Sequence, residues 1–180
     1  NHYESEIGHF IGAVTPNVDS FKESLKFLGK NFKNENKNKK ILLYCTGGIR
    51  CEKASAFLKN KGFKKVFQLD GGIINYARQI KKTGNNNKFV GKNFVFDNRL
   101  SEKITDDIIS NCHQCGTKSD QHSNCSNVAC NILFIQCEHC KNLYNGCCSI
   151  ECQKINSLSL EKQKSLRRGK KASKRIYKKI

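Results

Sequence analysis

Cysteine crowding in the second half of the chain is the feature that most restricts its fold. Nine of the eleven cysteines lie between Cys112 and Cys152, a stretch with few large apolar side chains. So short a segment buries too little apolar surface to hold itself together, and a cross-link or a bound metal must supply the missing folding free energy. Thiolate ligation of a metal is favoured, because disulfides are rare in the cytoplasmic setting expected here.

Paired CxxC turns strengthen this interpretation. Cys112-His113-Gln114-Cys115 and Cys137-Glu138-His139-Cys140 each set two thiolates at the separation that one tetrahedral zinc ion requires. The candidate ligands of one or two structural zinc ions are the nine cysteines of the region: Cys112, Cys115, Cys125, Cys130, Cys137, Cys140, Cys147, Cys148 and Cys152. They would fill two four-coordinate sites and leave one thiol over. A disulfide cluster and reduced thiols that simply pack are the alternatives.

The chain is strongly basic and has no segment typical of membrane proteins. Lys and Arg number 33 against 15 Asp and Glu, which gives a formal net charge of +18. Clustered positive charge gains affinity for phosphate backbones by counterion release, so nucleic acid is the expected partner. An AT-rich coding sequence that favours lysine is the alternative explanation.

Without a long apolar run or a secretory leader, we expect a cytoplasmic protein with no membrane partner. No stable protein partner is inferred.

Strand-like and helix-like patterns alternate over the first 80 residues and predict an α/β unit. A helix is expected from Ser20, which has capping-box spacing to Glu23. Further helices are predicted at 51–58 and 73–80, strands at 41–44 and 66–69, and an isolated strand at 94–96. From Leu158 onward the composition predicts a partly helical or disordered tail.

Cys45 directly follows the apolar strand at 41–44 and opens a glycine-containing loop that leads into a helix. Open α/β folds place their active sites at this point. The backbone N–H groups of residues 46–50 and the helix dipole favour a thiolate there, and Arg50 is placed to stabilise that thiolate or an anionic substrate group. The alternative for Cys45 is a buried, inert cysteine; for Cys51 we favour packing over a resolving or redox role.

The length of this loop argues against phosphatase chemistry. Four residues separate Cys45 from Arg50, whereas cysteine phosphatases have five between the corresponding residues. The loop is therefore too short to form their cradle for a tetrahedral phosphate.

Three motifs, in the same order along the chain, resemble the rhodanese family: Glu6-Ile7-Gly8-His9-Phe10-Ile11-Gly12-Ala13-Val14, the segment from Cys45 to Ser55, and the segment from Gln68 to Tyr76. Together with the cysteine-rich region, they resemble the rhodanese-related tRNA uridine hydroxylases over nearly the whole chain. This resemblance implies an α/β fold with a rhodanese-like parallel sheet flanked by helices, followed by a small cysteine-rich zinc-binding module and a basic tail.

The resemblance also implies a chemistry. Members of this family use molecular oxygen as cosubstrate to convert the wobble uridine of certain tRNAs to 5-hydroxyuridine, and Cys45 occupies the position of the essential cysteine. Arg50, from its place at the end of the loop, is the second candidate catalytic residue. tRNA is the implied partner. No flavin, haem or iron motif is visible, so the electron donor stays unknown. A persulfide-forming sulfurtransferase and a non-catalytic, zinc-stabilised RNA-binding fragment are the alternatives.

The expected domains follow from these assignments. Residues 1–84 form a rhodanese domain that is incomplete at its N-terminus, because the family has a further strand and a ferredoxin-like domain before this point. The remainder is divided into a connector at 85–110, a cysteine-rich module at 111–157 and a basic tail at 158–180. We expect the tail, with Tyr177 among its basic residues, to contact RNA phosphates and stack one base, so that removing 161–180 weakens tRNA binding. A solvated, unoccupied tail is the alternative.

Overall fold

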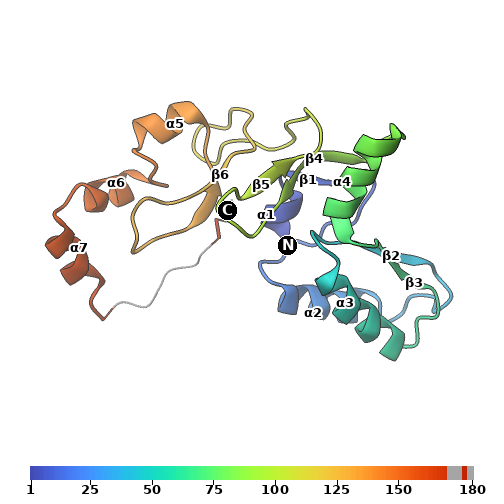
Figure 1. The fold of residues 1–180 in the computed structure, drawn as a ribbon. Helices are drawn as coiled ribbons and strands as arrows, with labels where there is room; N and C mark the ends of the chain where they lie inside the picture. Colours follow the sequence, from blue (N-terminus) through green and yellow to red (C-terminus); the bar gives the residue numbers. More distant parts are fainter. Residues whose placement is uncertain (170–175, 178–180) are drawn as a thin grey trace. The chain divides into compact units, whose positions relative to one another are not determined.

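The computed structural model describes residues 1–169 and 176–177, and it divides the chain into two compact units (Figure 1). The first unit comprises Asn1–Phe96 and Glu102–Asp106, and the second comprises Asp97–Ser101 and Asp107–Ile180. Among the described residues, no helix has the length and apolar character needed to cross a membrane.

Helices and strands alternate in the first unit, as its sequence predicts. The elements are α1 (His2–Ser5), β1 (Gly8–Phe10), α2 (Phe21–Asn31), β2 (Ile41–Leu43), α3 (Ile49–Asn60), β3 (Val66–Gln68), α4 (Gly72–Thr83) and β4 (Phe89–Phe94). The predicted start of α2 is confirmed, because the Ser20 hydroxyl oxygen accepts a hydrogen bond from the Glu23 N–H at 3.3 Å. This bond satisfies one of the N–H groups that a helix start leaves without a partner.

The strands of the first unit form two separate sheets. β2 and β3 pair in parallel, with Ile41 opposite Val66. β1 pairs antiparallel with β4, and β5 (Ser101–Lys103) completes a sheet of order β1-β4-β5. The prediction of an isolated strand at 94–96 is therefore wrong, since the strand begins at Phe89 and has partners on both sides. β1 lies far away in the sequence and β5 is only three residues long, so the local pattern around residue 94 indicated neither partner.

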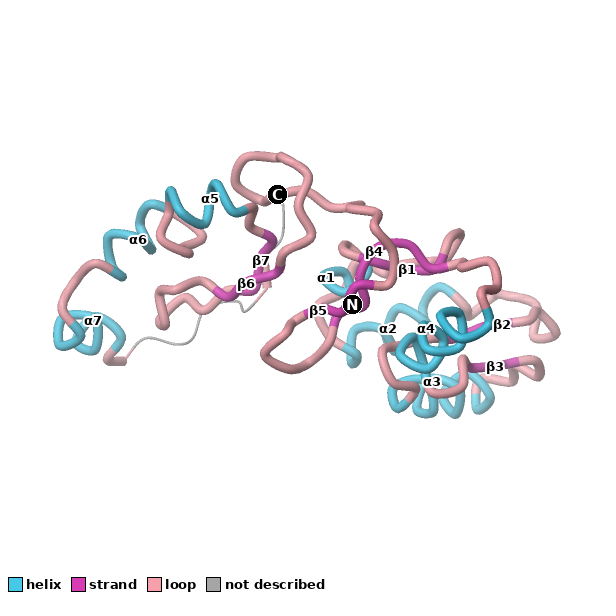
Figure 2. The backbone as a smooth tube through the Cα atoms, turned by 45° about the horizontal axis from the view of Figure 1, so that its top comes forward, coloured by secondary structure: helices cyan, strands magenta, loops and turns pink. Residues whose placement is uncertain are grey.

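The core of the first unit joins the parallel strand pair to α2 and α3, which pack against each other (Figure 2). Four buried side chains form its centre, and partly buried apolar side chains from α2 and its C-terminal cap, from α3 and from β2 pack around them: Ile41, Leu58, Phe63 and Val66, with Leu28, Phe32, Leu43 and Phe57. This packing fixes the end of β2 relative to the start of α3. The loop that carries Cys45 is thus held at both ends.

The second unit is built on an antiparallel strand pair and short helices. Its elements are β6 (His122–Asn124), β7 (Leu133–Ile135), α5 (Glu138–Leu143), α6 (Ile150–Asn156) and α7 (Leu160–Arg167). α7 confirms the helical part of the predicted tail, whereas the tail residues 170–175 and 178–180 lie outside the described residues. Ile176 forms a bridge to Leu133, and the Tyr177 ring stacks on His113 with centroids 4.4 Å apart.

Candidate active site and metal centres

The Cys45 loop packs against the first turn of α4. The Ile73 N–H donates to the Cys45 carbonyl at 3.0 Å, and the Ile74 N–H donates to the Thr46 carbonyl at 3.1 Å. Gly72 has a φ of +65°, and a Cβ at this position would lie 2.5 Å from the Cys45 carbonyl oxygen, so only glycine fits. α4 therefore engages the first carbonyl groups of the loop, while the N–H groups that follow are directed to the Cys45 sulfur.

Cys45 is a thiolate at neutral pH in this environment. Its Sγ accepts a hydrogen bond from the Gly48 N–H at 3.1 Å. The hydrogen bond from the Cys51 thiol, supported by the N–H groups of Cys51, Gly48 and Arg50, outweighs the opposing effect of burial and lowers the pKa of Cys45 to about 5. The side chain is 9% exposed. Hydrogen bonds to the thiolate stabilise the charged form and so lower the pKa. The thiolate, not the neutral thiol, is the nucleophile.

Cys51 is the partner that keeps the negative charge on Cys45. It lies in the first turn of α3, is 2% exposed, and its N–H donates to the Gly48 carbonyl at 2.9 Å. The hydrogen bond to Cys45, together with burial, raises the pKa of Cys51 far above its usual value. The two thiols therefore share one charge, which lies on Cys45, and Cys51 stays protonated as the donor.

Replacing Cys51 by alanine is expected to raise the pKa of Cys45, because the largest contribution to its lowering is lost. The rate of Cys45 alkylation by iodoacetamide, followed by peptide mass spectrometry across pH, measures the thiolate fraction. In the wild type this rate should be constant above about pH 6 and fall as the pH drops through 5. The fall should move to higher pH in Cys51→Ala and return toward the wild-type position in Cys51→Ser, which keeps a donor. An unchanged profile in Cys51→Ala would contradict this role.

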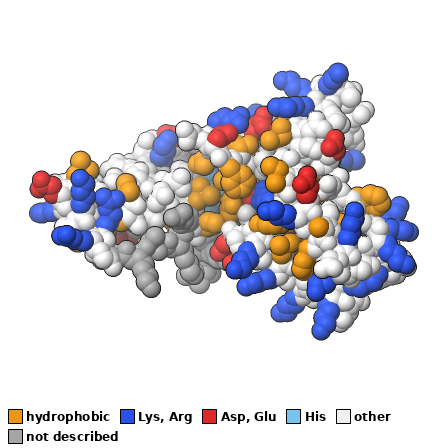
Figure 3. Space-filling model, turned by 60° about the horizontal axis from the view of Figure 1, so that its bottom comes forward, with side chains coloured by type: hydrophobic (Ala, Val, Ile, Leu, Met, Phe, Trp, Pro, Cys, Tyr) orange, Lys and Arg blue, Asp and Glu red, His pale blue; other side chains and the backbone are white. Residues whose placement is uncertain are grey.

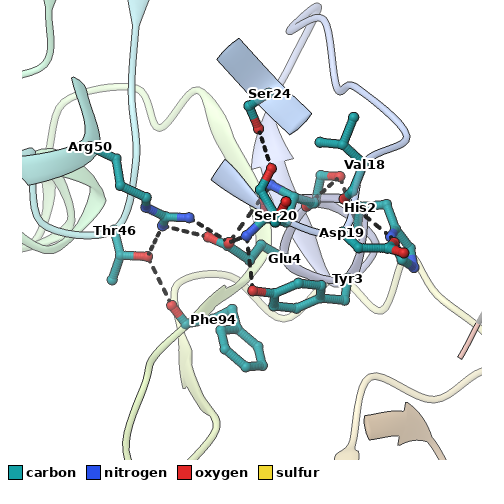
Figure 4. Close-up of polar contacts among 12 residues, drawn as sticks. His2, Tyr3, Glu4, Val18, Asp19, Ser20, Ser24, Thr46, Arg50 and Phe94 are labelled. Atoms are coloured by element: carbon teal, nitrogen blue, oxygen red, sulfur yellow. Dashed lines mark hydrogen bonds and ion pairs between the residues drawn. The ribbon is translucent and has the colours of Figure 1, made fainter. Parts of the chain in front are cut away.

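Arg50 is held by a carboxylate on the opposite side of the loop (Figure 4). Its two terminal nitrogens donate to the two Glu4 oxygens at 2.6 and 2.7 Å, and one of them also donates to Thr46 Oγ1 at 3.3 Å. Burial disfavours the Arg50 charge, but the hydrogen bonds and charge of Glu4 overcome it and raise the pKa of Arg50. Both terminal nitrogens of the Arg50 guanidinium are thus already bonded to Glu4. The structural role of Arg50 is to attach the loop to α1.

Two contacts of this site could not be found from sequence spacing. Glu4 lies in α1, far along the chain from Arg50, and no motif links them. Thr46 Oγ1 donates to the Phe94 carbonyl at 3.1 Å, which ties the loop to the end of β4 (Figure 4). Both contacts depend on how α1 and β4 pack, and the local pattern of the loop carries no signal for them.

Eight of the nine candidate metal ligands form two groups of four. The first cysteine cluster is Cys112, Cys115, Cys137 and Cys140, and the second is Cys125, Cys130, Cys148 and Cys152. Pairing of β6 with β7 explains the division. It brings the segment before β6, which carries Cys112 and Cys115, next to the segment after β7, which carries Cys137 and Cys140. Cys125 and Cys130 of the second cluster lie in the loop that connects the two strands.

The sulfur positions fit a tetrahedral metal. Within each cluster the sulfur atoms all lie within 4.8 Å of one another. The Sγ atoms of Cys115 and Cys137 are 3.5 Å apart, and Cys148 Sγ is 3.7 Å from those of Cys130 and Cys152. An ion bound to four sulfurs at about 2.3 Å separates them by about 3.8 Å, and a set of four thiolates is typical of structural zinc.

Cys147 lies outside both clusters, although the sequence counted it among the nine candidates. It is fully buried in the apolar core of the second unit beside Cys125 and Phe134. His113 is not part of either cluster, and its Nδ1 accepts a hydrogen bond from the Ile135 N–H at 3.2 Å. Cys147 is thus the thiol left over, and its place in the core indicates a packing role.

Comparisons with known proteins agree with this architecture. A family model described as a rhodanese-like domain matches residues 1–79, and a model described as rhodanase C-terminal matches residues 90–153. The first match contains the Cys45 loop, and the second contains every cysteine of the two clusters.

Curated relatives match almost the full chain. A protein named tRNA uridine(34) hydroxylase from Leptospira interrogans is 55% identical over 99% of this chain and 48% of its own length. Proteins of the same name from Pectobacterium atrosepticum and Sodalis glossinidius are 50% and 51% identical over 99% of this chain, which corresponds to 50% and 51% of their lengths. The chain thus spans about half the length of these relatives. The chain therefore contains a rhodanese-like domain, and over nearly its full length it is similar to proteins named tRNA uridine(34) hydroxylase.

Proposed function

We propose that the protein carrying this chain is an oxygen-dependent tRNA uridine hydroxylase that forms 5-hydroxyuridine at the wobble position, with Cys45 as its nucleophile. The observation that carries this proposal is the Cys45 thiolate, held in a cavity by the donors of its own loop. The names of relatives at 50–55% identity support the same substrate and reaction. Arg50 supports catalysis by holding the loop through Glu4 and Thr46.

The thiolate makes uridine reactive at the carbon that is hydroxylated. Addition of the Cys45 sulfur to C6 places negative charge on C5 and on the C4 carbonyl oxygen, so that C5 becomes nucleophilic enough to bond to oxygen. Loss of the C5 proton and departure of the sulfur then restore the ring. One atom of dioxygen enters the base and the other leaves as water, which consumes two electrons from an external donor and two protons.

Isotopic labelling of oxygen tests this proposal. The complete protein is incubated with unmodified tRNA and a reductant under ¹⁸O₂, and the nucleosides are analysed by mass spectrometry. We expect 5-hydroxyuridine that carries the heavy isotope. Absence of 5-hydroxyuridine, or a label that comes from water in place of dioxygen, would contradict the proposal.

A sulfurtransferase is the second candidate, because the same thiolate loop lies in a rhodanese-like domain. In that reaction the Cys45 sulfur would attack the outer sulfur of thiosulfate, release sulfite and carry a persulfide. Incubating the complete protein with thiosulfate and measuring the mass of the Cys45 peptide separates the two functions. A stoichiometric persulfide that is passed to cyanide, without 5-hydroxyuridine formation, would favour the sulfurtransferase.

The two cysteine clusters are proposed to hold one zinc ion each. The four thiolates of each cluster fit such an ion, which would cross-link the segments of a unit with a small apolar core. The ion would stabilise the fold and take no part in the reaction.

The basic surface is proposed to bind the tRNA backbone. Figure 3 shows Lys and Arg side chains distributed over the visible face, with few Asp and Glu side chains among them. On α7 and just after it, Lys162, Lys164 and Arg168 are exposed. Truncation of the tail would also remove Tyr177, which stacks on His113 in the second unit. Charge replacement is therefore the cleaner test.

Changing Lys162, Lys164 and Arg168 together to glutamine is expected to weaken tRNA binding. Three lost phosphate contacts should reduce the slope of log Kd against log salt concentration by about two, because each contact releases roughly 0.7 to 0.9 counterions. Binding titrations at several salt concentrations measure this slope. The control exchanges Lys for Arg and Arg for Lys at the same positions and should keep the slope. A slope that is equal in all three proteins would contradict a role of these residues.

A further inference from the structure

The thiolate faces a cavity of about 200 Å³ within the first unit. The residues that line it include Cys45, Cys51 and Arg50 of the catalytic loop and helix, together with Tyr44, Asn93 and Phe94. Most of its wall is apolar, as in sites that hold a flat ring by contact and orient it with few polar groups. Asn93 is one of the polar residues in this lining, and the catalytic loop makes no use of its amide.

Asn93 is buried without satisfying its hydrogen-bonding groups. Its side chain is 1% exposed, and neither Nδ2 nor Oδ1 has a partner among the residues that the structure describes. A buried amide without partners destabilises a fold, because its hydrogen bonds to water are lost and none replaces them. Such groups are rare in native proteins, and each calls for a physical explanation. Asn93 lines the cavity, and its two amide atoms have almost no exposed surface, so a ligand in the cavity supplies the missing partners when the side chain turns toward it.

β4 holds the backbone of Asn93 at a fixed position relative to the Cys45 loop. The next residue, Phe94, accepts a hydrogen bond through its carbonyl from Thr46 Oγ1 at 3.1 Å, and Thr46 follows Cys45 directly. The Phe94 ring also packs edge-on against Tyr3 and Phe96, with centroids 5.1 Å away in each case. The strand that carries Asn93 is therefore tied to the loop that carries Cys45.

We propose that Asn93 recognises the uracil ring of the substrate, with Oδ1 accepting from the ring N3–H and Nδ2 donating to O4. This inference rests on the proposed function and names the residue that selects and orients its substrate base. An amide offers one acceptor and one donor side by side, which matches the adjacent donor and acceptor on this edge of uracil. Enzymes that act on a single base of RNA or DNA generally take it out of its stack and recognise this same edge.

The same pair of hydrogen bonds assists the reaction. When the Cys45 sulfur adds to C6, negative charge develops on O4, and the Nδ2–H of Asn93 donates to that atom. A donor already placed where charge develops stabilises the transition state more than the ground state. Asn93 thus both holds the ring against the sulfur and favours its addition.

Protection of Cys45 from alkylation tests the proposal without requiring turnover. The complete protein is mixed with an anticodon stem-loop RNA that carries uridine or 3-methyluridine at the wobble position, and the rate of Cys45 alkylation by iodoacetamide gives the binding constant. Loss of N3–H should weaken protection of the wild type by about tenfold to a hundredfold, the usual value of a bidentate base contact. Leucine has a volume similar to that of asparagine and no polar group. In Asn93→Leu, replacing uridine by 3-methyluridine in the RNA should therefore change the binding constant by less than about threefold.

Thermal unfolding separates recognition from a structural role. A leucine at this position should leave the unfolding temperature unchanged or raise it, because an unpaired buried amide is replaced by an apolar group. A lower unfolding temperature for Asn93→Leu, or an equal methylation penalty in both proteins, would overturn the proposal, since the amide would then bond to the protein itself or face no base. If the RNA protects Cys45 from alkylation as expected but no 5-hydroxyuridine forms, the proposed hydroxylation is wrong, whereas recognition of the base by Asn93 is supported.

Discussion

Removal of bound metal by a strong chelator is expected to unfold the second unit and to leave the rhodanese-like unit folded. The apolar core of the second unit is small: Phe134 packs with two cysteines, Ile135 is buried beside them in the chain, and the surrounding apolar side chains are only partly buried. Structural zinc contributes about 10–16 kcal/mol of apparent binding free energy in small zinc-dependent folds, which is as large as the entire stability of a typical domain. Without the metal, little remains to hold β6, β7 and the short helices together.

Hydrogen exchange with and without chelator measures this effect on each unit separately. Amides of β6 and β7 should lose their protection, whereas amides of β2 and α3 should keep it. Metal analysis should give two ions per chain in the wild type and fewer in Cys112→Ala or Cys125→Ala, which each remove one cluster ligand. The matched control, Cys147→Ala, removes a cysteine outside both clusters and should keep two ions. Protection that survives the chelator would show that this unit folds by other means.

Replacing Cys45 by alanine is expected to reduce hydroxylation on the order of a thousandfold or more while the fold is kept. The nucleophile itself is lost, and the residual rate depends only on substrate positioning. Cys45→Ser should be almost as inactive, because a serine hydroxyl stays protonated at the pH where the Cys45 pKa of about 5 gives a thiolate. Turnover of unmodified tRNA by the purified variants, with circular dichroism as the check on folding, measures the loss. Activity of Cys45→Ala within tenfold of the wild type would exclude Cys45 as the nucleophile.

The local part of the fold and the site could be predicted from the sequence. The strand at residue 41, the loop and α3 follow one another without a gap, so apolar pattern, glycines and helix start all lie within one short segment. The position of Cys45 at the end of a parallel strand was predicted on that basis, and the family resemblance followed from the same residues. Arg50 was placed at the end of the loop for the same reason.

Contacts between distant segments could not be predicted in this way. Glu4 holds Arg50 through a bidentate pair that depends on how α1 packs, and β1 pairs with β4 although their sequences carry no signal for register. The sequence supplied nine candidate metal ligands, but only the pairing of β6 with β7 divided them and left Cys147 in the core. Asn93 could not be identified from the sequence, because a polar residue next to an apolar strand pattern has no distinctive spacing. Its burial without hydrogen-bond partners made it a candidate for substrate binding.

The division of roles at the thiol loop follows from these distant contacts. Because Glu4 already occupies the Arg50 guanidinium, the loop offers the substrate no free cation there. The charge of the Cys45 thiolate is balanced mainly by hydrogen bonds from Cys51 and from backbone N–H groups. Such a site suits a neutral ring, such as uracil, better than a phosphate, which agrees with a loop one residue shorter than that of the cysteine phosphatases.

In the proposed reaction the Cys45 thiolate activates the wobble uridine of tRNA for hydroxylation. The most direct test is mass spectrometry of tRNA nucleosides from cells whose only copy of the complete protein carries Cys45→Ala, grown beside cells with the wild type and with Cys51→Ser. We expect 5-hydroxyuridine and its derivatives to be absent from the wobble position in Cys45→Ala and present in the other two. Persistence of the modification in the Cys45→Ala cells, in the absence of any second hydroxylating enzyme, would contradict the claim.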